Sequence, residues 1–400
     1  MSKIDDLIAK LCPNGVEYKT IEEVCSTVSA GGDLPENYEK GQLVPTDKFP
    51  YPIYSNGSNE NALYGFTNTY RIDKDAVTVS ARGTIGYHAV RKKFFTPIVR
   101  LITLLPNNRI ITAEYLNYAL DITEIGHSGG SIPQLTVPNI KKVCIPVPPL
   151  EIQREIVKVL DTFTKLEAEL EAELEARRRQ YHYYRDQLLN FEGRDDVQWM
   201  VLGEVITNLR TGLNPRQNFV LNPPDAKNYY ITVRELGGLR IVLSDKTDKI
   251  NDDALKIINN RSKLRTGDVL FSGTGTIGNT ALIECAPSNW NIKEGVYALT
   301  PNIKKIISKF LLYLLKTTYV LSQINSYSAG STVVSISMAN FKRVIIPVPS
   351  LEEQTRIVAI LDKFDALVND LSSGLPAEIA ARRKQYEYYR DRLLTFKEAQ

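Results

Sequence analysis

The sequence predicts the α+β fold class, with two mixed α/β domains separated by two long helices. Two observations support this prediction. The chain has 400 residues, which is enough for two or three domains. A charged, tyrosine-rich helical sequence also occurs twice, at residues 166–191 and 381–396. We therefore expect a duplicated unit, each copy made of one domain and one helix.

The repeat consists of two aligned blocks. At a shift of 201 residues, IPVPPLEIQREIVKVLDTF (145–163) aligns with IPVPSLEEQTRIVAILDKF (346–364). At a shift of 205 residues, ARRRQYHYYRDQLLNF aligns with ARRKQYEYYRDRLLTF. The inserts between these blocks hardly resemble each other in sequence. A shared helical frame therefore carries two different inserts, because a period near 200 residues is too long for a solenoid.

The two blocks divide the chain into four segments. The prolines of IPVPP prevent a helix before Pro149, which suits a first helical turn. The stretch Ser372-Ser373-Gly374-Leu375-Pro376 predicts a kink or a break in the second helix. The predicted segments are a first domain at 1–144, a central helix at 145–192, a second domain at 193–345 and a C-terminal helix at 346–400, kinked near 372–376.

Each long helix carries one apolar stripe at three- and four-residue steps. A helix of about forty residues is about 60 Å long and has nothing of its own to cover such a stripe. The other copy is the obvious partner. We expect the tyrosines of the stripe to be core or interface residues, although stacking on bases remains open. The predicted interface residues are Leu160, Phe163, Tyr181, Tyr184, Leu188, Leu361, Phe364, Tyr386, Tyr389 and Leu393.

The inserts are predicted to mix short strands and short helices. Ala76–Ser80 and Asp268–Ser272 are β-type runs, whereas Ala113–Leu120 and Ser308–Lys316 are predicted helices. Each β-type run precedes a turn rich in Gly and Thr, ARGTIG in the first insert and GTGTIG in the second. Such turns expose backbone N–H groups and hydroxyls that suit phosphate or base edges. A plain hairpin turn is the alternative interpretation.

A methyltransferase centre is disfavoured, although two segments resemble its motifs. GTGTIG fits the pattern G-x-G-x-x-G, which needs a helix directly after it. The strand-like NTALIE follows instead. Asn222-Pro223-Pro224-Asp225 is close to an N-P-P-aromatic motif, but Asp225 cannot stack on a flipped adenine.

Composition limits the remaining function classes. Residues 12–140 hold 11 Lys and Arg against 13 Asp and Glu, whereas residues 193–340 hold 17 against 12. If the first half binds DNA, it must use local basic patches such as Arg91-Lys92-Lys93. The four cysteines and three histidines are scattered, so no metal site is expected. We expect a cytoplasmic protein, because no apolar run suits a membrane span and no signal peptide is recognised.

The doubled helix block resembles the specificity subunit of type I restriction–modification systems. The turns ARGTIG and GTGTIG, YPIYSNG (51–57) and NRSKLRTGDVLFSGTGTIG (260–278) support the resemblance, which covers nearly the whole chain. It implies two target-recognition domains, each reading one half of a split site in double-stranded DNA. Two antiparallel helices, related by a pseudo-two-fold axis, would hold the domains apart as a coiled coil.

The same resemblance implies that the chain has no catalytic centre and binds no cofactor itself. Its implied partners are two adenine methyltransferase subunits, which use S-adenosylmethionine, and two motor-nuclease subunits, which use ATP and magnesium. A stand-alone adenine methyltransferase and a non-enzymatic coiled-coil scaffold remain as alternatives. Helix length is expected to set the distance between half-sites, since one four-residue LEAE step is about 6 Å of helix.

Carried onto this sequence, the resemblance implies DNA-facing residues in loops, for phosphate positioning and base-edge contact. In the first domain the candidates are Ser55, Asn56, Arg82, Gly83, Thr84 and Gly86. The basic residues Arg91, Lys92 and Lys93 are further candidates because of their charge, with a solvated surface turn as the alternative. In the second domain the candidates are Thr274, Gly275, Thr276 and Gly278, with Arg234 and Lys293 as further candidates.

Overall fold

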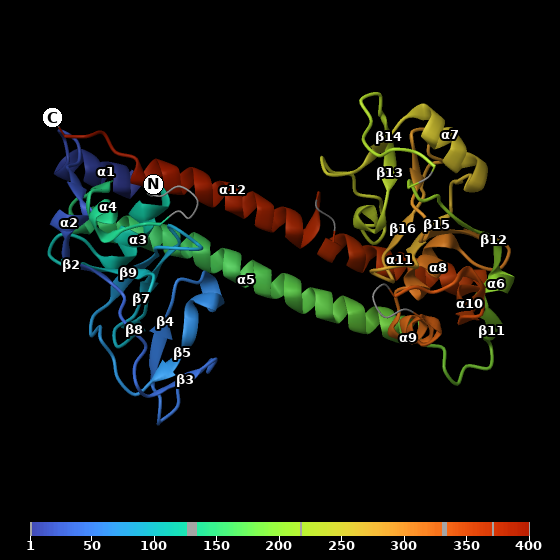
Figure 1. The fold of residues 1–400 in the computed structure, drawn as a ribbon, viewed down its shortest axis with the longest axis horizontal. Coiled ribbons are helices and arrows are strands. Elements are labelled where there is room, and N and C mark those ends of the chain that lie inside the picture. Colours follow the sequence, from blue (N-terminus) through green and yellow to red (C-terminus); the bar gives the residue numbers. More distant parts are fainter. Residues whose placement is uncertain (1, 126–133, 217, 330–333, 370–371, 400) are drawn as a thin grey trace. The chain divides into compact units, whose positions relative to one another are not determined.

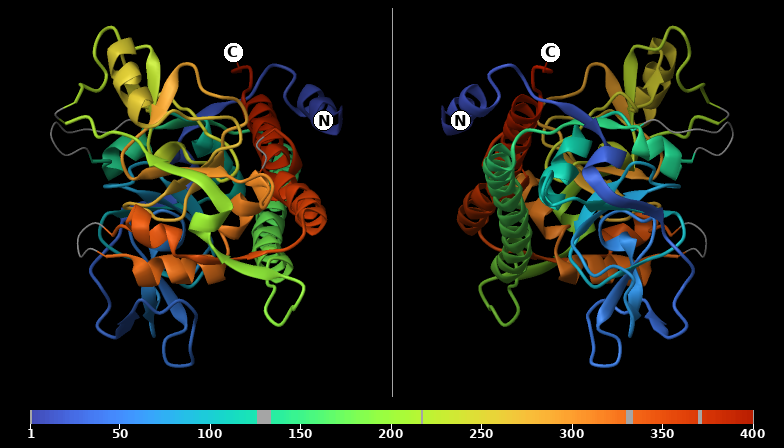
Figure 2. Two further views of the ribbon diagram at one scale, coloured as in Figure 1. Left: turned by 90° about the vertical axis from the view of Figure 1, so that its right-hand side faces the viewer. Right: turned by 90° about the vertical axis from the view of Figure 1, so that its left-hand side faces the viewer.

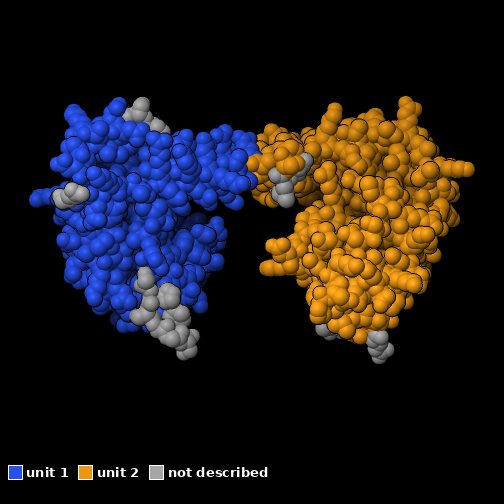
Figure 3. Space-filling view, turned by 90° about the horizontal axis from the view of Figure 1, so that it is seen from above, with its two compact units in different colours: residues 1–171, 378–400 blue, residues 172–377 orange. Residues whose placement is uncertain are grey.

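The computed structural model describes residues 2–125, 134–216, 218–329, 334–369 and 372–399. The chain forms two compact units (Figure 3). Unit 1 contains residues 1–171 and 378–400, and unit 2 contains residues 172–377. Each unit combines short helices and small sheets with parts of the long helices (Figure 1), which confirms the predicted α+β class.

The core of unit 1 is built on a four-stranded antiparallel sheet. β6 lies between β9 and β7, and all five of its residues are buried, which explains its continuous run of small and β-branched residues. The predicted strand and the strand after the turn are both confirmed. In spatial order the strands are β2 (Cys25–Ala30), β9 (Leu101–Pro106), β6 (Ala76–Ser80) and β7 (His88–Arg91).

Smaller elements complete unit 1. A second sheet has the order β3-β5-β4-β8, in which β4 and β8 are parallel. β1 and β10 form a separate antiparallel pair. The strands are β1 (Tyr18–Thr20), β3 (Tyr38–Lys40), β4 (Tyr51–Tyr54), β5 (Leu63–Thr67), β8 (Thr96–Pro97) and β10 (Cys144–Pro146). The helices are α1 (Ser2–Leu11), α2 (Ile21–Val24), η1 (Asn59–Ala62), α3 (Ala113–Asp121) and α4 (Val137–Lys141).

Unit 2 repeats this plan. Its four-stranded antiparallel sheet has the order β12-β18-β15-β16, and its second sheet, β14-β13-β17, again contains a parallel pair. The strands are β11 (Gln198–Val201), β12 (Ile206–Thr211), β13 (Asn228–Ile231), β14 (Lys249–Ile250), β15 (Val269–Ser272), β16 (Thr280–Leu282), β17 (Trp290–Ile292), β18 (Val296–Pro301) and β19 (Ile345–Val348). The helices are α6 (Leu202–Val205), η2 (Val233–Glu235), α7 (Asp252–Arg261), α8 (Ser308–Leu314), α9 (Thr318–Tyr327) and α10 (Met338–Lys342).

The two inserts therefore share one sheet topology although their sequences hardly match. This shared topology is not detectable by aligning the two inserts. Strand formation constrains burial and backbone pairing more than it constrains residue identity. The shared topology is visible in the main sheets, where the last strand before the α3 or α8 helix occupies the second position in both units.

Two long helices each run from one unit into the other (Figure 1 and Figure 2), and a third lies wholly within unit 2. α5 (Leu150–Leu188) is one continuous helix whose first part belongs to unit 1 and whose last part belongs to unit 2. The second repeat contains two helices, α11 (Leu351–Asn369) and α12 (Gly374–Leu394). α12 begins at Gly374, whose φ of 75° lies in the left-handed region that glycine adopts most readily.

Each unit pairs the beginning of one repeat's helix with the end of the other's. In unit 1, Phe163 stacks on Tyr389 with ring centroids 5.3 Å apart. In unit 2, Phe364 stacks on Tyr184 with ring centroids 5.8 Å apart. These are the same two repeat positions with the copies exchanged, so the helices run antiparallel within each unit. The helical region of each repeat therefore starts in one unit and ends in the other.

A repeated glutamine fixes each helix start to its sheet region. Gln153 is fully buried, donates to the carbonyl oxygens of Ile110 and Pro148, and accepts from the Thr112 N–H. Gln354 makes the equivalent three hydrogen bonds in unit 2. A buried amide with all these bonds satisfied specifies one arrangement, because leaving any of them unmade is costly.

Candidate nucleic-acid interface

The ARGTIG turn of unit 1 connects β6 to β7. The Gly86 N–H donates to the Ser80 carbonyl over 3.0 Å, and the Ser80 N–H donates to the Tyr87 carbonyl over 2.7 Å. Gly83 has a φ of 80° and Gly86 a φ of 83°. A side chain at either position would be strained, so the sequence needs glycine there. The turn is therefore closed and its backbone is fixed.

The loop that follows β4 is held against this turn. The carbonyl of Asn56 accepts hydrogen bonds from the hydroxyls of Ser80 and Thr84, each over 2.6 Å. The Asn56 side-chain amide donates to the Arg82 carbonyl over 2.6 Å. The structure thus brings the predicted residues of YPIYSNG and ARGTIG together. Ser55 belongs to the same loop, and its N–H donates to the Ala62 carbonyl.

The functional groups of these candidates divide into two kinds. The polar groups of Asn56 and Thr84 are engaged within the chain, so they fix the loop. The guanidinium of Arg82 makes no hydrogen bond or ion pair with any residue that the structure describes, and the residue is half-buried. Arg82 is therefore the side chain of this turn that is available to a ligand.

The GTGTIG turn of unit 2 has the same construction. It joins β15 to β16, with φ of 76° at Gly275 and 103° at Gly278. The Ser272 hydroxyl donates to the Thr276 carbonyl over 2.6 Å. Because a strand and not a helix follows, the segment lacks the helix N-terminus that a dinucleotide-type loop requires.

Three candidates of the second domain line one cavity of about 330 Å³. They are Thr274, Arg234 and Lys293. Arg234 follows β13 and donates to Asp248 over 2.7 Å. Lys293 is exposed, and its amine has no partner within the described part of the chain. These three candidates come from separate segments of the sequence, and the fold brings them to one cavity.

Backbone hydrogen bonds show that the two turns are equivalent. The Ala81 N–H donates to the Arg100 carbonyl over 2.9 Å, and the Gly273 N–H donates to the Gly295 carbonyl over 2.8 Å. The carbonyl of Ala81 accepts from Leu135, as that of Gly273 accepts from Ile336. Arg82 and Thr274 therefore occupy matching positions in the two units.

Two further arginines at this place were missed. Arg100 is exposed and has a φ of 72°, where unit 2 has Gly295 with a φ of 88°. The Arg71 guanidinium lies over Gly32, since a Cβ added there would be 2.3 Å from Arg71 Nη1. Gly32 forms a bridge with Ile98, two residues before Arg100. A weak match of LITLLP with VYALTP at a shift of 195 residues is the sequence signal that could have located Arg100.

The basic triplet lies at the other end of β7 from the turn. Arg91 donates to the Thr78 hydroxyl over 3.1 Å and lies over the Tyr54 ring at 4.0 Å. Lys92 forms ion pairs with Asp75 at 2.9 Å and Glu114 at 3.0 Å. Lys93 lies over a phenylalanine ring at 5.1 Å. The triplet therefore does not lie at the ARGTIG turn, and its contact with DNA stays a prediction.

Comparison with known proteins identifies the family. The family described as "Type I restriction modification DNA specificity domain" matches residues 13–176 and 195–381 of this chain. The chain belongs to this family. A type I restriction enzyme specificity subunit of Escherichia coli is 31% identical over 368 residues, covering 88% of each chain. A putative type I restriction enzyme specificity subunit of Haemophilus influenzae is 34% identical over 401 residues, covering 95% of this chain and 96% of the relative.

Solved structures support the fold. A structure described for the assembly and conformational transition of the type I restriction–modification system matches with a TM-score of 0.62 and 19% identity, over 96% of this chain and 98% of the other. The specificity subunit from M. genitalium matches with a TM-score of 0.56 and 16% identity, over 95% and 96%. At these low sequence identities, the two matches show similarity of the fold alone. The two matched segments of the family correspond to the two repeats of this specificity subunit.

The predicted helix-interface residues of this specificity subunit pack within its two units. Tyr181 is buried and its hydroxyl donates to Asp365 over 3.3 Å. Two neighbouring tyrosines remain outside, Tyr183 with 61% and Tyr388 with 60% of their surface exposed. The predicted residues in the core of unit 1 or packed on it are Leu160, Phe163, Tyr386, Tyr389 and Leu393. Those of unit 2 are Tyr181, Tyr184, Leu188, Leu361 and Phe364.

The described residues contain neither a metal-binding cluster nor a membrane-spanning helix. Within the described ranges, no three or more His, Cys, Asp or Glu side chains gather as a metal site would require. Over the same ranges, no helix has the length and apolar character needed to cross a bilayer.

Proposed function

We propose that this specificity subunit reads a bipartite site in double-stranded DNA, one half through each unit. Two glycine-containing turns with fixed backbones occupy equivalent positions, and their side chains differ. Unit 1 offers Arg82 and Arg100 where unit 2 offers Thr274 and Gly295. Arginine reads guanine bidentately in the major groove, whereas threonine and a bare backbone offer other contacts. One frame with different side chains suits two different half-sites, and this observation carries the proposal.

We propose further that the long helices dock two adenine methyltransferase subunits, with two motor-nuclease subunits completing the complex. Tyr183 and Tyr388 support this part. They are the same repeat position, one in each unit, and both are large exposed aromatic side chains on a helix. Aromatic residues are enriched where proteins bind one another. A repeated exposed anchor suits two copies of one partner.

In this proposal the chain itself is not the catalyst and holds no cofactor. S-adenosylmethionine, ATP and magnesium would enter through the partner subunits. Since the substrate is cellular DNA, the complex would work in the cytoplasm.

The proposal is tested by sequencing DNA methylation in cells with and without this gene, with the methyltransferase present. The expected result is loss of one adenine-methylated motif made of two half-sites around a fixed spacer. An unchanged methylation pattern in cells that express the assembled complex would contradict the proposal. Binding of S-adenosylmethionine by the purified chain alone would favour a stand-alone methyltransferase instead.

A further inference from the structure

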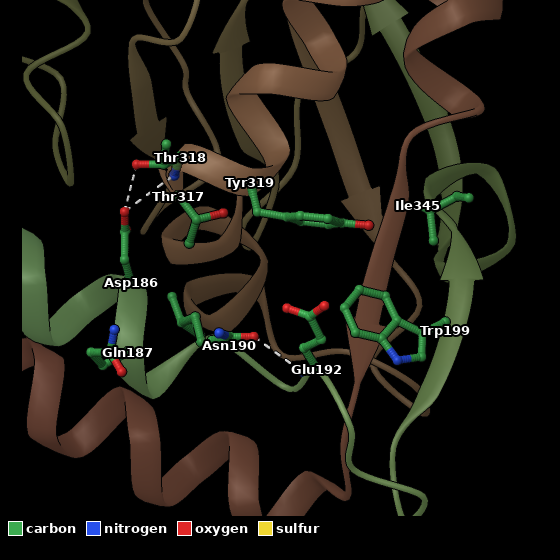
Figure 4. A pocket seen from close by; sticks show the side chains of 10 residues that line it. Asp186, Gln187, Asn190, Glu192, Trp199, Thr317, Thr318, Tyr319 and Ile345 are labelled. Atoms are coloured by element: carbon green, nitrogen blue, oxygen red, sulfur yellow. Dashed lines mark hydrogen bonds between the residues drawn. The ribbon is translucent and has the colours of Figure 1, made fainter.

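Unit 2 contains a cavity of about 690 Å³ that lies away from the GTGTIG turn. It is formed where the end of α5 meets β11 and the beginning of α9 (Figure 4). Figure 1 shows α9 and β11 at the opposite end of unit 2 from β13 and β14, which neighbour the smaller cavity near the turn. We call the large cavity the α9 notch. Its position separates it from the candidate DNA contacts.

Two aromatic rings form one wall of the α9 notch. Trp199 and Tyr319 meet edge to face with ring centroids 5.6 Å apart. Trp199 is 41% exposed and Tyr319 is 50% exposed, which is unusual for side chains of this size that contact each other. Ile345 is also 40% exposed at the same cavity. The notch is therefore open, and it presents uncovered aromatic faces.

The charged groups of the α9 notch are acidic. Of the residues that the structure describes, Glu192 and Asp186 line it, and no lysine or arginine does. Asp186 is already engaged by the Thr318 hydroxyl over 2.6 Å and by the neighbouring Arg185. The Glu192 carboxylate has no hydrogen bond or ion pair to a described residue, and Figure 4 shows it beside the two rings. Burial, and then the charge of Glu192, raise the pKa of the Tyr319 hydroxyl, so the carboxylate lies close to that ring.

This combination recognises a cation attached to an apolar stem. The faces of Trp and Tyr attract an ammonium or guanidinium group, and a free carboxylate beside them adds a charged acceptor. The second domain that carries the notch is basic in sequence, with 17 Lys and Arg against 12 Asp and Glu in residues 193–340, whereas the charged side chains lining the notch are acidic. An acidic cavity repels phosphate and attracts a protein's basic side chain.

We propose that the α9 notch accepts a lysine or arginine side chain of a methyltransferase subunit docked on the specificity subunit. The inference rests on the proposed function and names one contact of the docking surface. Arginine suits the notch best, because its planar group stacks on an aromatic face while donating to a carboxylate.

The described residues of unit 1 do not repeat the chemistry of the α9 notch. Tyr18 takes the place of Trp199, since both pair with the same repeated proline, and Lys397 aligns with Glu192 at the shift of 205 residues. The contact therefore concerns one of the two methyltransferase copies, which gives the proposal a specific signature.

The test measures assembly of the full chain with its methyltransferase subunit by native mass spectrometry, which resolves complexes of one and two copies. Glu192→Gln should weaken one of the two binding steps about tenfold and leave the other unchanged. Glu192→Lys should abolish that step. Asp195→Asn is the matched control, because Asp195 is an exposed carboxylate three residues away and has no partner among the described residues.

A second measurement reports directly on the environment of Trp199 in the α9 notch. Labelling the chain with 5-fluorotryptophan gives two fluorine signals, because Trp199 and Trp290 are its two tryptophans. Unlabelled methyltransferase should shift the Trp199 signal, and Glu192→Lys should remove that shift. A shift of Trp199 on adding duplex DNA alone would overturn the proposal in favour of a DNA contact.

The outcomes separate the two hypotheses. If the methyltransferase binds and Glu192→Gln behaves like wild type in both steps, the α9 notch is not the docking contact, but the proposed function stands. If the methyltransferase does not bind the wild-type chain, the proposed function fails and this inference fails with it. Equal weakening of both steps would indicate a general defect and would also overturn the proposal.

Discussion

Arg82 offers the sharpest test of half-site reading. Its guanidinium has no partner among the described residues, whereas its carbonyl accepts the Asn56 amide. An alanine substitution keeps that carbonyl and removes no side-chain hydrogen bond or ion pair to a described residue, so the free energy of unfolding should change by less than about 0.5 kcal/mol. Arg82→Ala therefore separates binding from folding.

The expected effect on DNA binding follows from the kind of contact. A bidentate arginine–guanine contact contributes about 1–3 kcal/mol of discrimination against a wrong base. This corresponds to a loss of about 5- to 150-fold in affinity for duplexes with the intact half-site. For a duplex in which that half-site is already scrambled, Arg82→Ala should reduce the affinity only slightly. The assay is competition binding of the assembled complex to duplexes with either half-site scrambled, at fixed salt concentration.

Two controls sharpen this experiment. Arg82→Lys keeps the charge but loses the planar fork, so it should retain the dependence of affinity on salt and still lose base discrimination. Thr274→Ala, at the matching position in unit 2, should affect the other half-site. Equal loss for both half-sites with an unchanged melting temperature would refute the reasoning, as would an unchanged preference in the Arg82→Ala complex.

Three other predictions concern stability and geometry. Asp268→Ala leaves the buried Arg210 charge uncompensated, so unfolding of unit 2 should become easier by about 3–5 kcal/mol, and a change under about 1 kcal/mol in urea unfolding would contradict this. Burial raises the pKa of Asp75, but hydrogen bonds from Lys92 and the following backbone N–H outweigh it and hold the pKa below 3.8. The contact thus stabilises the fold above that pH and is lost as the pH falls through the lowered pKa, so Asp75→Asn should lower the melting temperature at pH 7, and its difference from wild type should shrink as the pH falls below 3.8. Deleting Leu170–Glu173 removes about 6 Å of helix and should shorten the methylated motif's spacer by one or two base pairs, and an unchanged spacer would refute it.

The sequence predicted correctly those features that depend on local residue patterns or on the repeat. The stripe containing Phe163, Tyr184 and Tyr389 follows from helical periodicity, and the structure buries or stacks these rings. The glycines of ARGTIG and GTGTIG predict turns because a left-handed φ is strained for other residues, and both turns are present. The family also followed from the doubled helix block.

The candidate site was less accessible to sequence reasoning. Arg71 and Arg100 carry no motif, and each is separated from Arg82 by other strands in the chain. They reach one place because β6 and β9 pair and Gly32 bridges to Ile98. Lys92 was a candidate as part of a basic run, but its charge is paired with two carboxylates from other segments. Charge counted along the chain does not show which charges are compensated in space.

The sequence by itself determined the duplicated plan, the long helices with their apolar faces and the two glycine turns. All of these depend on residues within a few positions of each other or on identity between the copies. The tertiary structure alone decided that two dissimilar inserts share one sheet order. It also decided that Trp199, Tyr319 and Glu192 enclose a notch in unit 2. The physical reason is that strand pairing, ion pairing and cavity formation depend on contacts between residues distant in sequence, which leave no local pattern to read.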